Sequence, residues 1–204
     1  MQPTIFIVDD DPSVRRSLVR LIQSHGRSVL EFPSAEAFLQ QYDPKRPGCL
    51  VLDVSMPGLD GLALQRKLDA PEISLPIIFI TGHGTIPDSV QAIKAGAVDF
   101  LTKPVSQDVL MSSIDAALEK DRITRQLRAE LAGIEARLSA LTPREREVLT
   151  YVVAGKVNKQ IAATLGTVEK TIKVHRSRLM QKLGVTSVAA LVKLAGRVGI
   201  VGPS

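Results

Sequence analysis

The chain has 204 residues, of which 45% are hydrophobic and 3% aromatic, and its formal net charge is +5. This length supports one medium core or two small ones, and no apolar run approaches the roughly 20 residues of a membrane-spanning helix. A single cysteine, Cys49, rules out a disulfide framework. Without a signal-peptide pattern, we expect a soluble protein of the reducing cytoplasm.

The charge is distributed unevenly along the chain. Residues 1–119 carry 10 basic and 15 acidic side chains, residues 120–139 carry 5 and 3, and residues 140–204 carry 11 and 3. A basic C-terminal third is typical of a chain that meets nucleic acid at one end. A merely solvated basic surface remains equally compatible with charge alone, so the assignment depends on motifs.

The first 119 residues alternate short apolar runs with helical patterns. The runs predict strands at 4–8, 28–32, 49–53, 77–81 and 98–102. The intervening patterns predict helices at 12–25, 34–42, 60–69, 86–95 and 106–119. The central runs are apolar on both faces, as parallel strands covered by helices must be. We therefore expect an α/β domain, built from five βα repeats around a parallel sheet.

Polar residues suited to phosphoryl chemistry stand where these strands end: Asp9, Asp10, Asp53, Thr81 and Lys103. The carboxyl ends of parallel strands meet at one edge of a sheet, where ligands of such folds bind. We therefore expect these five side chains to form one site. Each has an ordinary interpretation alone, as a helix cap, a strand residue or a surface lysine, and their coincidence carries the prediction.

Within this site Asp53 is the expected nucleophile, which would form an acyl phosphate. Three crowded carboxylates repel an incoming phosphoryl group unless a cation intervenes, and Mg²⁺ (or Mn²⁺) suits oxygen ligands of this kind. We expect Asp10 and Asp53 to be direct ligands, with Asp9 acting through water. Lys103 would supply a positive charge, and the Thr81 hydroxyl would bond the phosphoryl group.

A change of pattern at residue 120 predicts a linker helix over 120–139. Apolar residues there recur at alternating spacings of four and three: Leu127, Leu131, Ile134, Leu138 and Leu141. About two heptads are too few to indicate a coiled coil, so we favour a helix that lies with one face on a domain. The competing hypothesis is that the seam pairs with a second copy of the chain.

A small all-α domain is predicted over residues 140–204. Thr142 is the expected cap of its first helix, with Pro143 at the first helical position and Glu145 completing a capping box. Three more helices are expected, from Asn158 (as cap) to Thr164, from Val168 to Leu183 and from Ser187 to Ala195. Four short helices leave no room for a catalytic cleft of ordinary size.

The first 119 residues resemble a bacterial two-component receiver domain. The motifs are VDD at 8–10, LDVSMPGLDG at 52–61, ITGHG at 80–84 and DFLTKP at 99–104. The resemblance implies a flavodoxin-like five-stranded sheet of order 2-1-3-4-5. It also implies that the Ser55 backbone carbonyl binds the metal and that the Lys103-Pro104 peptide bond is cis.

The same resemblance implies a switch. Thr81 would move toward the phosphoryl group, and the ring of Phe100 would follow it inward, while the region 86–102 rearranges. Ser55 and His83 flank the path of the attacking water in receivers and would influence the lifetime of the acyl phosphate. For His83 we favour an ordinary loop residue over a kinetic role.

Residues 141–185 resemble the LuxR-type helix-turn-helix of the FixJ and NarL subfamily of response regulators. The resemblance implies that the helix from Val168 enters a major groove, while its Ile172, Leu179 and Leu183 are buried. Expected DNA contacts are Lys173, Val174 and Ser177 at base edges, Lys159, Thr171, Arg176 and Arg178 at phosphates, and Lys170 on the same exposed face.

Two details of this helix are open. Val168 stands where the family usually has a capping Ser or Thr, so either Thr167 takes over the cap or the helix end frays. His175 is expected to be a packed structural residue and not a pH sensor.

The motifs together predict a two-component response regulator. A partner histidine kinase would phosphorylate Asp53, and the chain would dimerise, bind double-stranded DNA and act with RNA polymerase, by analogy as an activator. An aspartate-dependent phosphatase predicts an Asp-x-Asp-x-Thr/Val run after the first strand, whereas residues 9–13 read Asp-Asp-Asp-Pro-Ser. Two further hypotheses are a LuxR protein gated by a small signal molecule and a regulator whose receiver is vestigial.

Overall fold

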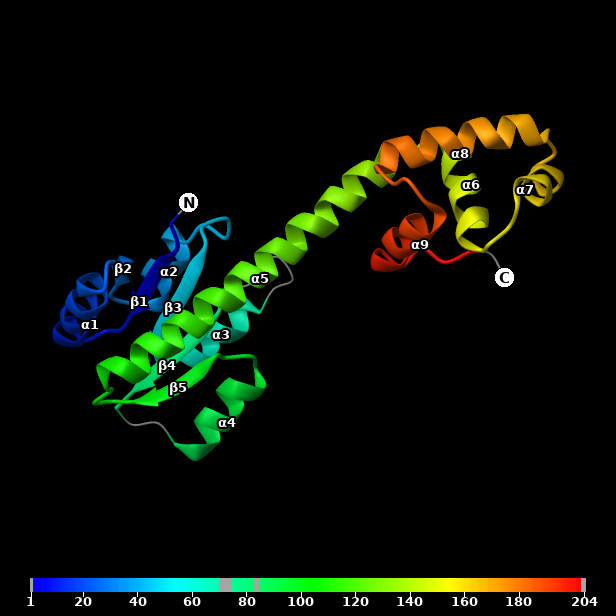
Figure 1. Ribbon diagram of the computed structural model, residues 1–204. Helices are drawn as coiled ribbons and strands as arrows, with labels where there is room; N and C mark the ends of the chain where they lie inside the picture. The colour runs from blue at the N-terminus through cyan, green and yellow to red at the C-terminus, as the bar shows by residue number, and fades with distance from the viewer. Residues whose placement is uncertain (1, 70–74, 83–84, 203–204) are drawn as a thin grey trace. The chain divides into compact units, whose positions relative to one another are not determined.

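The structure is a computed structural model, which describes residues 2–69, 75–82 and 85–202. The chain divides into two compact units, Met1–Arg125 and Gln126–Ser204. Figure 1 shows an α/β unit in the N-terminal part and a purely helical unit in the C-terminal part. Each unit is described by itself.

A five-stranded parallel sheet of order β2-β1-β3-β4-β5 forms the first unit. Its strands are β1 (Thr4–Val8), β2 (Ser28–Phe32), β3 (Gly48–Asp53), β4 (Ile77–Thr81) and β5 (Asp99–Thr102). Its helices are α1 (Pro12–Ser24), α2 (Ala35–Gln41), α3 (Gly61–Leu68), α4 (Ile86–Lys94) and α5 (Gln107–Ser139). The predicted fold class and strand order are confirmed.

Two apolar layers cover the two faces of this sheet. One contains Leu18 and Ile22 of α1 together with Leu110 and Ile114 of α5. The other is contributed by α2, α3 and α4, with Phe38 of α2 at its centre. All residues of β1, β3 and β4 are buried, which explains why their sequences are apolar on both faces.

The last helix of the first unit is longer than predicted. α5 does not end near residue 119 but continues as one helix to Ser139, so the expected linker helix is its extension. The boundary between the compact units falls after Arg125, six residues beyond the expected end of the receiver domain.

The second unit packs the end of α5 against four short helices. These are α6 (Pro143–Val153), α7 (Asn158–Thr164), α8 (Glu169–Leu183) and α9 (Val188–Arg197). Ile134 and Leu138 are buried in its core, whereas Leu127 and Leu131 are exposed. The second half of the predicted apolar seam therefore lies on a domain, as favoured, and the first half does not.

Local capping chemistry explains several of the helix ends in this unit. The predicted capping box of Thr142 and Glu145 is present, and Gly184 ends α8 with a left-handed backbone at φ 66°. The predicted cap at Asn158 is wrong. Asn158 is the first residue of α7, and its side-chain oxygen accepts a hydrogen bond from Arg176 instead.

Candidate functional site

Three of the predicted site residues meet at the carboxyl edge of the sheet. Lys103 Nζ lies 2.7 Å from Asp9 Oδ2 and 2.7 Å from Asp53 Oδ1, and donates a hydrogen bond to each. Asp9 is 2% exposed and Asp53 6%. Asp53 ends β3, Asp9 follows β1 and Lys103 follows β5, so the parallel topology brings together residues 94 positions apart.

Asp53 and Lys103 have shifted pKa values at this site. Burial raises the pKa of the Asp53 carboxyl, and the hydrogen bond from Lys103 opposes that rise only in part. Burial by itself would lower the pKa of Lys103, but its hydrogen bonds to Asp53 and Asp9 raise it. The site therefore holds a fully charged lysine against two carboxylates, one of which is costly to keep ionised.

Backbone groups hold the second oxygen of each carboxylate. Asp53 Oδ2 accepts from the Ser55 amide at 2.8 Å, and Asp9 Oδ1 accepts from the Asp11 amide at 2.9 Å. Arg15 donates to the Asp9 carbonyl at 2.7 Å. Each carboxylate thus presents one oxygen to Lys103 and one to its own loop, which fixes the direction of both side chains.

Gly61 makes a close backbone approach to Asp53; it is the last residue of the motif at 52–61, but no role had been assigned to it. A Cβ added to Gly61 would lie 2.2 Å from the Asp53 carbonyl oxygen, and the Gly61 amide donates to the Val54 carbonyl at 2.9 Å. Only glycine allows α3 to begin so near the end of β3. The sequence could have indicated this close approach, because the Asp60-Gly61 pair stands at the start of a helical pattern.

The predicted switch residues lie beside this cluster. Thr81 is fully buried at the end of β4, and its carbonyl accepts from the Lys103 amide at 2.8 Å. Phe100 is half-buried, with its ring centroid 5.9 Å from that of Phe79. The Lys103-Pro104 bond is cis, as the resemblance implies. His83 lies outside the described residues.

The predicted metal ligands are only partly grouped. Asp10 is exposed, and Lys103 occupies the space between Asp9 and Asp53. In the part of the chain that the structure describes, no three Asp, Glu, His or Cys side chains are close enough to hold a metal ion. The donor chemistry nevertheless fits a hard divalent cation, because the carboxylate oxygens at this edge are ligands of the type that Mg²⁺ prefers.

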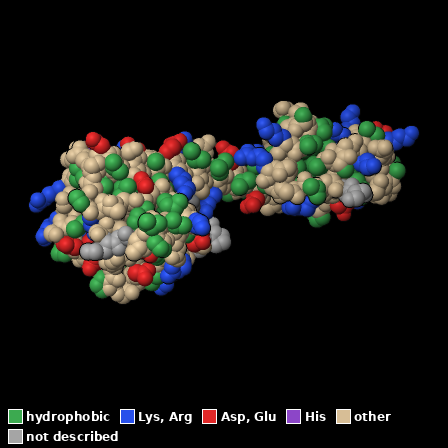
Figure 2. Space-filling view, turned by 90° about the horizontal axis from the view of Figure 1, so that it is seen from below, with side chains coloured by type: hydrophobic (Ala, Val, Ile, Leu, Met, Phe, Trp, Pro, Cys, Tyr) green, Lys and Arg blue, Asp and Glu red, His purple; other side chains and the backbone are tan. Residues whose placement is uncertain are grey.

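The predicted DNA-contacting residues lie on α7 and α8. Those with exposed side chains are Lys159, Lys170, Lys173, Val174, Ser177 and Arg178. Thr171 and Arg176 are half-buried, and Arg176 Nη1 donates to Asn158 Oδ1 at 3.0 Å, which ties α8 to the start of α7. In the view of Figure 2, lysine and arginine side chains stand on the surface of the helical unit.

The buried side of α8 agrees with the prediction. Ile172, Leu179 and Leu183 are fully buried. The N-cap of α8 is Val168, which makes no side-chain capping bond, and the amide of the preceding Thr167 donates to the Ala162 carbonyl. α8 begins at Glu169, directly after Val168.

The length of α5 raises the question of a membrane span. Among residues 2–69, 75–82 and 85–202, no helix is long and apolar enough to cross a membrane.

A five-stranded α/β unit with buried carboxylates and a lysine at one sheet edge, followed by a basic helical unit, is the arrangement of a response regulator with a DNA-binding output. Residues 5–115 match the response regulator receiver domain family, and residues 139–195 match the LuxR family of bacterial regulatory proteins. The chain belongs to the two-component response regulators that join a receiver domain to a LuxR-type DNA-binding domain.

Similarity to characterised proteins extends over nearly the whole chain. Nodulation protein W of Bradyrhizobium diazoefficiens is 45% identical over 96% of this chain and 86% of its own length. Transcriptional regulatory protein FixJ of the same organism is 41% identical, over 96% of both chains. The solved structure of response regulator StyR is 46% identical, covers 97% of this chain and all of its own, and has a TM-score of 0.89.

These matches separate the response-regulator hypotheses from the phosphatase and from the regulator gated by a small signal molecule. The chain is a FixJ-like transcription regulator and not a metabolic enzyme. A receiver domain implies a histidine kinase as partner, and a LuxR-type domain implies DNA. The receiver match over residues 5–115 speaks against a phosphatase and against an N-terminal domain built to bind a small signal molecule.

Proposed function

We propose that a partner histidine kinase phosphorylates Asp53, and that the phosphorylated chain dimerises and binds a specific DNA sequence to regulate transcription. The observation that carries the proposal is the Lys103 ammonium group, which bridges the buried carboxylates of Asp9 and Asp53. A carboxylate that is buried, oriented and faced by a cation suits transfer of a phosphoryl group.

In the transfer, one carboxylate oxygen of Asp53 attacks the phosphorus of a phosphohistidine. The P–O bond forms as the P–N bond breaks, and the bonding electron pair returns to the imidazole nitrogen of the donor. Lys103 stabilises the negative charge on the phosphoryl oxygens. The Ser55 amide keeps the attacking carboxylate oriented through its second oxygen.

A divalent cation, Mg²⁺ or Mn²⁺, is the cofactor of this proposal. Carboxylates of Asp9, Asp10 and Asp53 and the Ser55 carbonyl would hold it. When bound, the cation supplies positive charge that offsets the phosphoryl dianion. Support comes from a charge imbalance, because Asp9 and Asp53 share a single lysine. Asp10 is exposed and would have to turn toward the site.

The switch uses Thr81 and Phe100. The Thr81 hydroxyl would donate to the new phosphoryl group, and its displacement from β4 would open space for the Phe100 ring. Because Phe100 is only half-buried and lies on the edge strand β5, it can move without disturbing the strands at the centre of the sheet. The region 86–102, which contains α4 and β5, would then rearrange.

The rearranged face of α4 and β5 is the proposed dimer surface. α4 exposes a row of apolar side chains, Ile86, Val90 and Ile93. A second copy of the chain is the partner that phosphorylation would bring to this face. Pairing two helix-turn-helix units then matches paired half-sites on DNA.

On DNA, α8 would lie in the major groove. Lys173, Val174 and Ser177 would read base edges, and Lys159, Lys170, Thr171, Arg176 and Arg178 would contact phosphates. The exposure of six of these eight residues supports the assignment. By analogy with regulators of this subfamily, the bound dimer would recruit RNA polymerase and activate transcription.

The test is phosphorylation with acetyl phosphate, followed by selection from random DNA duplexes. Wild type with Mg²⁺ is expected to gain one phosphoryl group at Asp53 by mass spectrometry and to select one sequence. Asp53→Asn, or wild type with a chelator, is expected to do neither. Phosphate on Asp53→Asn, or equal selection by all samples, would contradict the proposal.

A further inference from the structure

The first two turns of the linker, residues 120–125, are held to the receiver more firmly than an ordinary exposed helix. We call this segment the linker root. It lies in the continuous helix α5 (Figure 1) and ends where the first compact unit ends, at Arg125.

Asp121 is the buried centre of the linker root. It is 2% exposed, and its Oδ2 accepts a hydrogen bond from the Gly48 amide at 3.0 Å. Arg125 Nε lies 2.8 Å from both carboxylate oxygens. A buried carboxylate is costly unless it is paired in this way, so Asp121 requires both partners.

Arg125 completes the attachment with the rest of its guanidinium group. Nη1 donates to the carbonyls of Pro44 and Lys45, each at 3.1 Å, and Nη2 donates to the Arg46 carbonyl at 2.8 Å. All these acceptors lie in the loop that precedes β3. The planar guanidinium group fits such a set of acceptors in one geometry, which a lysine could not reproduce.

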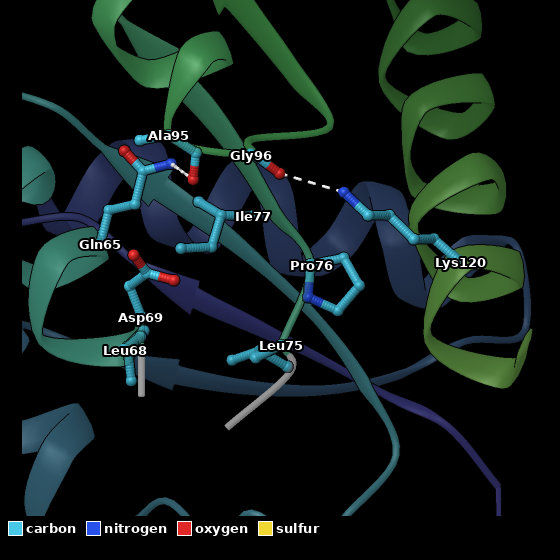
Figure 3. Close-up of a pocket in the computed structure, with 9 residues that line it drawn as sticks. All are labelled: Gln65, Leu68, Asp69, Leu75, Pro76, Ile77, Ala95, Gly96 and Lys120. Atoms are coloured by element: carbon cyan, nitrogen blue, oxygen red, sulfur yellow. Dashed lines mark hydrogen bonds between the residues drawn. The ribbon is translucent and has the colours of Figure 1, made fainter. Parts of the chain in front are cut away.

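Lys120 fastens the same segment to a different part of the receiver. Its Nζ donates to the Gly96 carbonyl at 3.0 Å, in the turn between α4 and β5 (Figure 3). Figure 3 also shows Gln65 of α3 reaching the Ala95 carbonyl beside it. The linker root therefore touches both the region expected to rearrange and the loop before β3.

The neighbouring ion pair on this helix is of an ordinary kind. Arg122 and Glu119 pair at 2.7 Å, but both side chains are more than half exposed. Such a surface pair contributes little. Two consecutive turns of α5 thus contain one solvated ion pair and one pair with a buried carboxylate and a fully bonded guanidinium group, which provides a matched control.

An ion pair with a buried carboxylate contributes little net stability compared with apolar residues of similar size, and fixing the arrangement of the elements that it joins is its best-attested role. We propose that Asp121 and Arg125 are positioning residues that fix the direction in which the linker helix leaves the receiver, so that a phosphorylated dimer recognises one spacing of DNA half-sites. The inference rests on the proposed phosphorylation-dependent DNA binding.

The experiment compares two duplexes with full-length protein treated with acetyl phosphate and Mg²⁺. One duplex is the sequence that phosphorylated wild type selects, and the other has an insertion of about 5 base pairs, or half a helical turn, between its half-sites. We expect the affinity of wild type and of Arg122→Gln to fall at least about tenfold on the duplex with altered spacing. We expect the affinity of Arg125→Gln and of Asp121→Asn to fall less than about threefold, because a loosened linker lets each DNA-binding unit reach its half-site independently.

Sedimentation of the phosphorylated proteins separates positioning from assembly. Arg125→Gln and Asp121→Asn are expected to dimerise as wild type does. Full spacing discrimination in both variants, or loss of their dimers, would overturn the inference. Asp121→Asn preserves the shape of the side chain, so it decides the outcome if Arg125→Gln does not fold. Failure of wild type to select any duplex would instead refute the proposed function, and the inference with it.

Discussion

A single ammonium group, that of Lys103, is shared by two buried carboxylates at the edge of the receiver sheet. Two carboxylates beside one ammonium group leave the site with an excess of negative charge. In the proposed mechanism this excess of negative charge is what a divalent cation would offset when a phosphoryl dianion approaches Asp53. The hydrogen bond from Lys103 offsets part of the cost of burying the ionised Asp53 carboxylate.

Removal of this charge should impair phosphorylation more than folding. In Lys103→Met the aliphatic stem is retained, but the negative charge that develops on the phosphoryl oxygens is no longer stabilised. We expect the rate of phosphorylation by acetyl phosphate to fall at least about tenfold. Phos-tag electrophoresis over time measures this rate. Lys67→Met, at an exposed position on α3, is the control, and an unchanged rate in Lys103→Met would argue against the assigned role.

Glu145 plays a comparable part in the DNA-binding unit, where it is 2% exposed. Its carboxylate accepts from Lys182 Nζ at 2.7 Å and from the Thr142 amide at 2.9 Å. The hydrogen bond from Lys182, followed by that of the Thr142 backbone, lowers the pKa of Glu145 below its usual 4.5. A lowered pKa means stability that is present above the usual value and is lost as the pH falls through the lowered one.

Glu145→Gln should therefore destabilise the unit in a pH-dependent way. We expect a loss of about 1–3 kcal/mol at pH 7, from a charge-assisted hydrogen bond and one half of a capping box. Thermal melts of both proteins from pH 7 to pH 3 should show the difference shrinking below pH 4.5. A difference that stays constant would mean that the ionised form of Glu145 is not what stabilises the fold.

At the scale of helices and strands, the features that could be predicted from the sequence are those that depend on residues close together in the chain. The strands were found because they are short apolar runs, and every predicted strand lies within one residue of the observed one. The cap of α6 was found because Thr142 and Glu145 act on their own turn. Asn158 was assigned wrongly, because its partner Arg176 is 18 residues away.

Contacts between residues far apart in the sequence could be predicted only where the topology fixes them. Asp9, Asp53 and Lys103 could be grouped because the parallel topology fixes where strand ends meet. The attachment of Arg125 to Pro44, roughly 80 residues earlier, has no local signature. The length of α5 was readable, since residues 107–139 contain no proline and only one glycine, but the change of composition at residue 120 suggested a boundary.

The N-terminus of α8 can be stabilised by adding the side-chain cap that it lacks. Val168 is the N-cap of α8 with an extended backbone, and its side chain is 64% exposed and makes no capping bond. Val168→Ser should supply that bond and stabilise the unit by about 1 kcal/mol. For a domain of this size such a gain raises the melting temperature by about 4–8 °C. Val168→Ala offers no acceptor and should show no gain, and a Ser variant that melts no higher than the Ala variant would contradict the assignment.

At the scale of the whole molecule, the proposed function depends on assembly. The apolar row on α4 is exposed in this structure, on the side of the sheet edge formed by β5. Contact with a second copy would bury it. An interface of this kind gains from apolar burial at its centre and is sensitive to an added charge there.

Val90→Glu should therefore prevent dimerisation of the phosphorylated chain without affecting the phosphorylation itself. Val90 is 46% exposed, so the change should leave the fold intact. Sedimentation equilibrium with acetyl phosphate and Mg²⁺ is expected to show dimers for wild type and monomers for the variant. Leu30→Glu, at a 40% exposed position on the opposite edge strand β2, should dimerise normally. Dimers of Val90→Glu would place the interface elsewhere.

The central claim is that a phosphoryl group on Asp53 controls DNA binding by the helix-turn-helix unit. Its most direct test is the affinity of the full-length chain for its selected duplex, measured as the phosphorylated fraction of Asp53 is varied. The account predicts that wild-type affinity rises with that fraction, by a factor within the range of about 5–150 that is typical of coupled sites. Asp53→Asn should stay at the unphosphorylated value throughout. An affinity that is independent of the phosphorylated fraction, or an equal rise in Asp53→Asn, would contradict the claim.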